Sequence, residues 1–151
     1  MKTLQKNQHG VVILEVLVSI VIFAVGVLGI VGLQAVTAKA GIDARFRTEA
    51  AAFADELVAR AQTWSDTTTL GTNFAGAVAT GGTEYQSWFA NRLALAGSGL
   101  PGAEATVAFP APLAAAATGG GVLMTVEISW QAPGGEFRGS HTTVAALPGG
   151  G

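Results

Sequence analysis

The sequence predicts an α+β fold, with a long N-terminal helix followed by a small head built on an antiparallel sheet. Three observations predict it. Residues 11–33 form a long apolar run, no proline interrupts residues 11–66, and apolar and polar residues alternate with period two in the last third of the chain. We expect a polar leader at 1–10, a membrane helix at 11–33, its continuation at 34–65, and an α+β head at 66–151.

The apolar run is 23 residues long, and a helix needs about 20 residues to cross a bilayer. Glu15 is the single charged residue in it. Because a carboxylate beside hydrocarbon is costly without a partner, Glu15 is a candidate functional residue. A secretory signal peptide has a shorter apolar stretch followed by a small-residue cleavage site. We therefore expect this run to remain as an anchor, with any cleavage before it.

The helix is expected to continue beyond the apolar run. From Ala50 onward, apolar residues recur at the spacing of one helical face: Ala50, Phe53, Ala54, Leu57, Val58, Ala61 and Trp64. Glu56 and Arg60 lie one turn apart and are expected to pair. A single helix of about 55 residues would be about 80 Å long, with Gly41 as its weakest point.

The middle of the chain is expected to hold one short helix. Residues 65–82 are rich in Thr, Gly and Ala, which predicts a loop. Thr83 and Gln86 have the spacing of a capping box, so a helix should begin there. Its apolar face would be Tyr85, Trp88, Phe89 and Leu93, and Gly97 and Pro101 follow its end.

Strands are expected in the last third. Residues 122–130 alternate strictly, residues 132–135 carry a turn signal, and residues 137–147 are long enough to return as an antiparallel partner. Residues 105–109 form a further candidate strand. The glycine-rich end at 148–151 is expected to be disordered.

Composition excludes several classes of function. The chain has no cysteine, so it forms no disulfide and no thiolate metal site. Lys2 and Lys6 lie in the leader, which leaves six Lys or Arg against ten Asp or Glu and no basic stripe for nucleic acid. His141 is expected on an exposed strand, and no phosphate-binding loop is present. We expect no enzyme activity, no metal and no cofactor, with Tyr85, Trp88, Phe89 and Trp130 in the core or an interface.

The stretch from Gly10 to Glu15 resembles the class III signal of type IV pilins and their relatives. In that family a prepilin peptidase cuts after the glycine, the new N-terminus is methylated, and a glutamate is kept at the fifth mature position. The resemblance implies cleavage between Gly10 and Val11, N-methylation of Val11, and an assembly role for Glu15. Val11 departs from the family pattern, because most relatives have Phe or Met there.

A finer resemblance is to the PilV-type minor pilins, the type IV pilus modification proteins. Three segments carry it: Leu28-Gly29-Ile30-Val31-Gly32-Leu33-Gln34, then residues 47–60, then Thr125-Val126-Glu127-Ile128-Ser129-Trp130. It implies a minor pilin that primes type IV pilus assembly or lies at the tip, supporting adhesion, twitching motility or DNA uptake. The implied partners are the prepilin peptidase, other minor and major pilins, and the inner-membrane assembly platform.

The implied location is the bacterial inner membrane, single-pass with a periplasmic head, and the pilus after assembly. Counting charges does not establish that orientation, because Lys2 and Lys6 precede the span while Lys39, Arg45 and Arg47 follow it. Two alternatives stay open. One is an I-type pseudopilin of type II secretion, whose first residues are very similar. The other is a signal-anchored periplasmic binding domain or enzyme, which would need neither Gly10 nor Glu15.

The resemblance to pilins gives Glu15 a physical role. Cleavage would expose an ammonium group on Val11, one helical turn from the carboxylate. When subunits stack, the carboxylate of one can meet the ammonium of the next, and two charges that are costly alone become tolerable as a pair. Gly26, Gly29 and Gly32 would let neighbouring helices approach closely or let this segment unwind.

Overall fold

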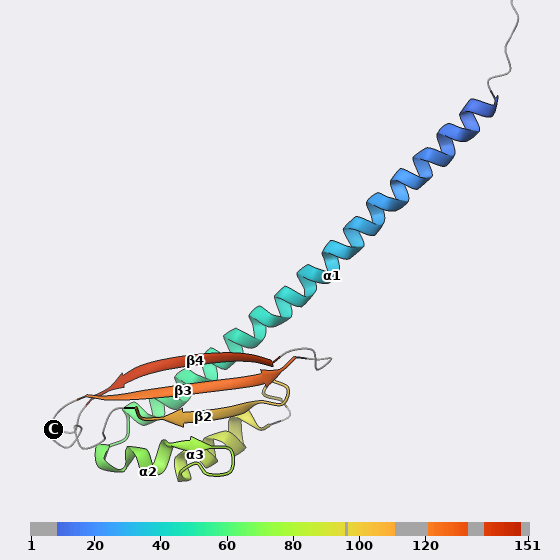
Figure 1. Ribbon diagram of the computed structural model, residues 1–151. Helices are drawn as coiled ribbons and strands as arrows, with labels where there is room; N and C mark the ends of the chain where they lie inside the picture. The colour runs from blue at the N-terminus through green and yellow to red at the C-terminus, as the bar shows by residue number, and fades with distance from the viewer. Residues whose placement is uncertain (1–8, 96, 111–120, 133–137, 149–151) are drawn as a thin grey trace, which may run out of the picture. The chain divides into compact units, whose positions relative to one another are not determined.

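The computed structural model describes residues 9–95, 97–110, 121–132 and 138–148. They divide into two compact units, Met1–Ile42 and Asp43–Gly151. We call the second the head unit. The helix α1, His9–Gln62, contributes to both units and contains 54 residues, as expected from the absence of proline (Figure 1). It remains helical through Gly26, Gly29, Gly32 and Gly41.

The C-terminal part of α1 supplies one wall of the head core. Ala50, Ala54, Leu57, Val58 and Ala61 are buried, and Phe53 and Trp64 pack against the same cluster. The predicted apolar face is therefore confirmed. The helix ends before Trp64 because Asp66 begins a new element: its carboxylate accepts a hydrogen bond from the Thr68 backbone N–H at 3.0 Å.

The prediction of a loop over residues 65–82 is wrong in part. A 3₁₀ turn, η1 at Thr67–Thr69, leads into α2 at Leu70–Phe74, and the short strand β1 follows at Gly76–Ala77. Two apolar side chains make this segment ordered, since Leu70 and Phe74 are fully buried. The ring of Phe74 meets Trp64 edge-on at 5.5 Å. Propensity alone misses such contacts.

The expected short helix is present, but the capping box is wrong. Helix α3 spans Thr83–Trp88 and continues as the π-helical segment η2, Phe89–Leu93. Its N-cap is Gly82, which makes no side-chain cap. A side chain at Gly82 would collide with the backbone of α2, which explains why a glycine occupies this position. The side-chain amide of Gln86 instead donates to the Val78 carbonyl at 2.9 Å.

The predicted apolar face of this helical segment is confirmed. Tyr85, Trp88 and Leu93 are fully buried, and Phe89 is half-buried and stacked on Tyr85 at 5.9 Å. The Tyr85 hydroxyl donates to the Ala105 carbonyl at 2.7 Å, and burial raises its pKa to about 12. This bond joins α3 to the sheet.

The sheet has four antiparallel strands in the order β1-β2-β3-β4 (Figure 1). Strand β2 is Glu104–Ala108, β3 is Val122–Gln131 and β4 is Arg138–Leu147, close to the predicted strands. Strand β3 buries every second residue, as its alternation predicts. These side chains form one core with α1, α2 and α3. The turn expected at 132–135 and the tail at 148–151 lie largely outside the described residues.

The backbone of β4 lies close to the Trp130 side chain at Gly139. This glycine lies opposite Trp130 in the register, and an added Cβ would run into the indole ring of that tryptophan. On the other side, the Trp130 ring packs against Phe46 of α1 at 6.5 Å. The indole is therefore held between the helix and the glycine backbone of β4.

We predict that Gly139→Ala lowers the free energy of unfolding of the head by about 1–3 kcal/mol, because the tryptophan has no room to shift. Thermal unfolding of the full chain in detergent measures this. The matched control is Gly97→Ala, whose added Cβ would have nothing within 4 Å. Equal stability of the two variants would contradict the close contact between Trp130 and β4.

Candidate assembly site on the N-terminal helix

The apolar run of α1 is exposed on all sides within its unit. From Val11 to Val36 its large hydrophobic side chains are between 40% and 72% exposed. A soluble helix normally exposes only a polar face. By length and composition, α1 is able to cross a membrane, with a mean hydropathy of 3.0 over its most apolar window. A surface of this kind suits lipid or a bundle of other apolar helices.

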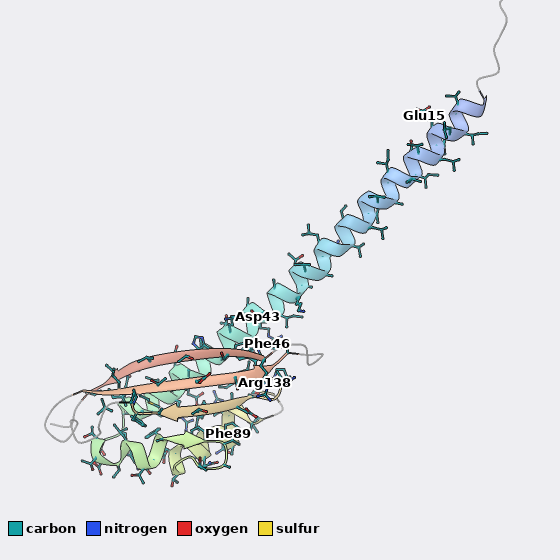
Figure 2. The ribbon with its side chains drawn as sticks, viewed as in Figure 1. Glu15, Asp43, Phe46, Phe89 and Arg138 are labelled. Carbon is teal, nitrogen blue, oxygen red and sulfur yellow. The ribbon has the colours of Figure 1, made fainter. Side chains whose placement is uncertain are left out.

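Glu15 lies on this surface, near the start of α1 (Figure 2). It borders a shallow groove of about 430 Å³ together with Val16, Ser19, Ile20 and Phe23. The Ser19 hydroxyl donates to the Glu15 backbone carbonyl at 2.7 Å, so it does not engage the carboxylate. Among the described residues, no cation pairs with the Glu15 carboxylate.

The predicted cleavage position lies in the first turn of the same helix. Helix α1 begins at His9, so Gly10 and Val11 have helical backbone. Glu15 lies four positions after Val11, which is about 6 Å of helix rise. The structure thus places the predicted new N-terminus one turn from the carboxylate. The rest of the leader, residues 1–8, is outside the described part of the chain.

The surface of α1 is open at three glycines, Gly26, Gly29 and Gly32. A Cβ added at any of them would meet nothing within 4 Å. Within the described chain they therefore serve no packing role, and they allow a second helix to approach closely.

The head unit contains one ion cluster that sequence patterning predicted only in part. Glu56 pairs with Arg60 at 2.8 Å, as expected, but its carboxylate also pairs with Arg92 of η2 at 2.9 Å. No spacing rule indicates a contact across 36 positions. Burial raises the pKa of Glu56, but the hydrogen bonds and charges of Arg92 and Arg60 outweigh it, so the pKa lies below its usual value. The cluster ties α1 to η2.

A further feature not predicted from the sequence is a cavity of about 560 Å³ in the head unit. Its wall consists of Phe46, Leu93 and the segment around Leu100. Beside it, the Glu49 side chain packs against Gly99, which adopts a positive φ of 82°. Glu49 is held from the other side by Arg45 at 2.8 Å. The wall is mainly apolar and holds no acid–base pair.

The other residues considered for catalysis, metal binding or ligand binding lie apart from one another. His141 is on β4, as expected, half-buried and 3.1 Å from the Thr143 hydroxyl. The described ranges contain no group of His, Cys, Asp and Glu suited to a metal ion. Tyr85, Trp88 and Trp130 are core residues and Phe89 lies at the edge of the core.

No protein-family model, curated protein or solved structure matches this chain.

We predict that Glu56→Gln lowers the stability of the head at neutral pH and has little effect in acid. Because the folded-state pKa is below the unfolded one, the carboxylate contributes stability above the unfolded pKa, near 4.5, and loses it as the pH falls through the folded pKa. The variant should therefore be less stable than wild type at neutral pH, and the difference should shrink at low pH. Denaturant unfolding across pH measures this. Asp55→Asn removes an exposed neighbouring carboxylate and is the control; an equal effect there would contradict the role of the cluster.

Proposed function

We propose that this chain is a type IV pilin-like prepilin. The observation that best supports this proposal is the single carboxylate, Glu15, on an otherwise apolar helix surface, one turn after Gly10 and Val11. A helix of this kind, followed by a small antiparallel head, suits a subunit whose apolar half lies in the membrane before assembly and among other helices afterwards.

Within that class, we propose a PilV-type minor pilin. The Gly29-x-x-Gly32-Leu33-Gln34 ending of the apolar run favours the pilus over an I-type pseudopilin of type II secretion. The proposed protein is an inner-membrane, single-pass subunit with its head in the periplasm. It acts by assembly with other minor and major pilins on the inner-membrane platform. It would prime the fibre or lie at its tip, and it would not act as an enzyme.

The chemistry of the proposed assembly step is an ion pair. Peptidase cleavage would leave an ammonium at Val11, and the carboxylate of Glu15 in a neighbouring subunit would accept it. An apolar helix bundle packs tightly but specifies axial position poorly, so a single pair of opposite charges sets the register. The open surface at Gly26, Gly29 and Gly32 supports close helix approach in the same bundle.

We predict cleavage between Gly10 and Val11. Intact mass and N-terminal sequencing of membrane-extracted protein should give a product that starts at Val11 only in cells that contain the prepilin peptidase. Gly10→Leu should stay full length in the same cells. Retention of residues 1–10 in both strains would overturn the proposal and favour a signal-anchored domain.

We predict that Glu15→Leu abolishes incorporation into pili while cleavage and membrane insertion continue. Leucine keeps the helix and its apolar character, so the variant removes only the charge. Removing one partner of a buried ion pair costs about 3–5 kcal/mol, which corresponds to more than a hundredfold loss of assembly. Immunoblots of sheared pilus fractions measure this.

Ser19→Ala is the matched control, since the Ser19 hydroxyl contacts only the helix backbone in the same groove. Normal incorporation of Glu15→Leu would show that this carboxylate does not direct assembly.

A further inference from the structure

The two edges of the sheet are built differently. The strand order leaves β1 at one edge and β4 at the other. Strand β1 has only two residues, and the turn after it is closed by backbone bonds from Thr80 and Gly81 to the Ala77 carbonyl. The side chain of Gln86 also binds this turn at Val78. This edge therefore offers little backbone to another chain.

The β4 edge is long and open. Strand β4 has ten residues, and all ten pair with β3 in one continuous register without a bulge. In the part of the chain that the structure describes, no backbone hydrogen bond joins the other side of β4 to another element. An edge strand of this length presents a row of unpaired N–H and C=O groups that can accept a further strand.

Strand β4 also lacks the usual protection of an edge. Proteins block exposed edges with proline, lysine, bulges or very short strands. Strand β4 has no proline or lysine, and its one permanent charge, Arg138, stands at its first position (Figure 2). Arg138 reaches Glu104 at 3.3 Å, but both side chains are more than half exposed, so this bridge holds the guanidinium only weakly.

The core is incompletely closed at this strand. The core-facing residues of β3, Val126 and Ile128, are fully buried, while their partners on β4, Thr143 and His141, are only half-buried. On the outer face Val144 is 61% exposed. A further strand beside β4 would bury both of these surfaces.

The polarity of the side chains changes along the length of β4. Residues 138–143 are polar or glycine, and residues 144–147 are all apolar. In an antiparallel pair of two copies, residues on the same face must lie opposite each other. If the two-fold axis passes through Thr142, Val144 lies opposite Ser140. If it passes through Thr143, Val144 lies opposite Thr142. The apolar half of one copy would then face the polar half of the other, so a second copy fits poorly.

We propose that the free edge of β4 accepts an extended strand of a different polypeptide in antiparallel orientation. Antiparallel pairing is the more stable arrangement. The incoming strand would begin with apolar residues, which lie against residues 144–147. It would end with acidic residues, whose charge complements Arg138. The edge belongs entirely to the head unit, so it is a feature of the head whether or not the leader is cleaved at Gly10.

The test uses the full chain in detergent and a synthetic peptide of ten residues. Its first half alternates valine and threonine, and its second half alternates glutamate and threonine. Residue-resolved amide hydrogen exchange is measured with and without the peptide at millimolar concentration. Every second amide of β4 should exchange at least about tenfold more slowly with the peptide, because the alternate amides already bond to β3. No alternating protection would overturn the proposal.

Two variants separate the edge from the sheet face. Val144→Lys places a charge at the edge and should weaken peptide binding by at least about tenfold. Leu123→Lys places the same charge on the same face of β3, where Leu123 is 44% exposed, and should leave binding unchanged. Equal loss in both variants would assign binding to the sheet face and overturn the edge proposal.

A charge exchange tests the orientation. Arg138→Glu should weaken binding of the acidic peptide, and a peptide with lysine in place of glutamate should restore it. Absence of this rescue would contradict the antiparallel orientation. Sedimentation of the full chain without peptide tests whether a second copy occupies the edge. A dimer that Val144→Lys dissociates would identify a second copy as the occupant and overturn the proposal of a different chain.

Discussion

Burial of one stripe of α1 against the sheet holds the head unit together. The stripe runs from Phe46 to Ala61, and its alanines, Ala50, Ala54 and Ala61, are almost completely buried. Strand β3 supplies Met124, Val126, Ile128 and Trp130 to the same core, and the shorter elements supply a few large side chains each, such as Phe74 from α2 and Trp88 from α3. With so small a core, each of these contacts matters. The Glu56–Arg92 pair adds a polar link between α1 and η2 at its border.

The two parts of α1 have different surfaces. Its head portion is amphipathic, and burial of its apolar stripe stabilises the helix there. Its apolar run has no such stripe, because every side is apolar and exposed. Helical backbone satisfies its own hydrogen bonds, which a bilayer demands of any spanning segment. Gly26, Gly29, Gly32 and Gly41 each lower helix propensity by about 1 kcal/mol against alanine, yet α1 is continuous across them, since propagation adds a hydrogen bond for each residue.

Features that depend on local spacing could be predicted from the sequence. The stripe of α1, the alternation in β3 and the apolar face beginning at Tyr85 are periodic patterns, and the structure has all three. Features that depend on distant contacts could not. The pairing of Glu56 with Arg92 has no local signature, and α2 forms because Leu70 and Phe74 find a core built by other segments. The predicted capping box is absent, because the N-cap is Gly82 instead of Thr83 and the Gln86 amide donates to the Val78 carbonyl of the preceding turn.

The candidate site divides in the same way. Glu15 could be found from sequence because one carboxylate in an apolar run is conspicuous, and the structure adds its position in an open groove. The free edge of β4 could not be found, because alternation does not reveal which strand ends a sheet. Charged residues make up only 12% of the chain, and several form pairs within the head, including Asp43 with Arg47 and Arg45 with Glu49. Few unpaired charged side chains remain to block or direct association with other chains. In the two proposals, apolar contact and backbone hydrogen bonds would give these open surfaces strength without much direction, and a single charge on each, Glu15 and Arg138, would supply the direction.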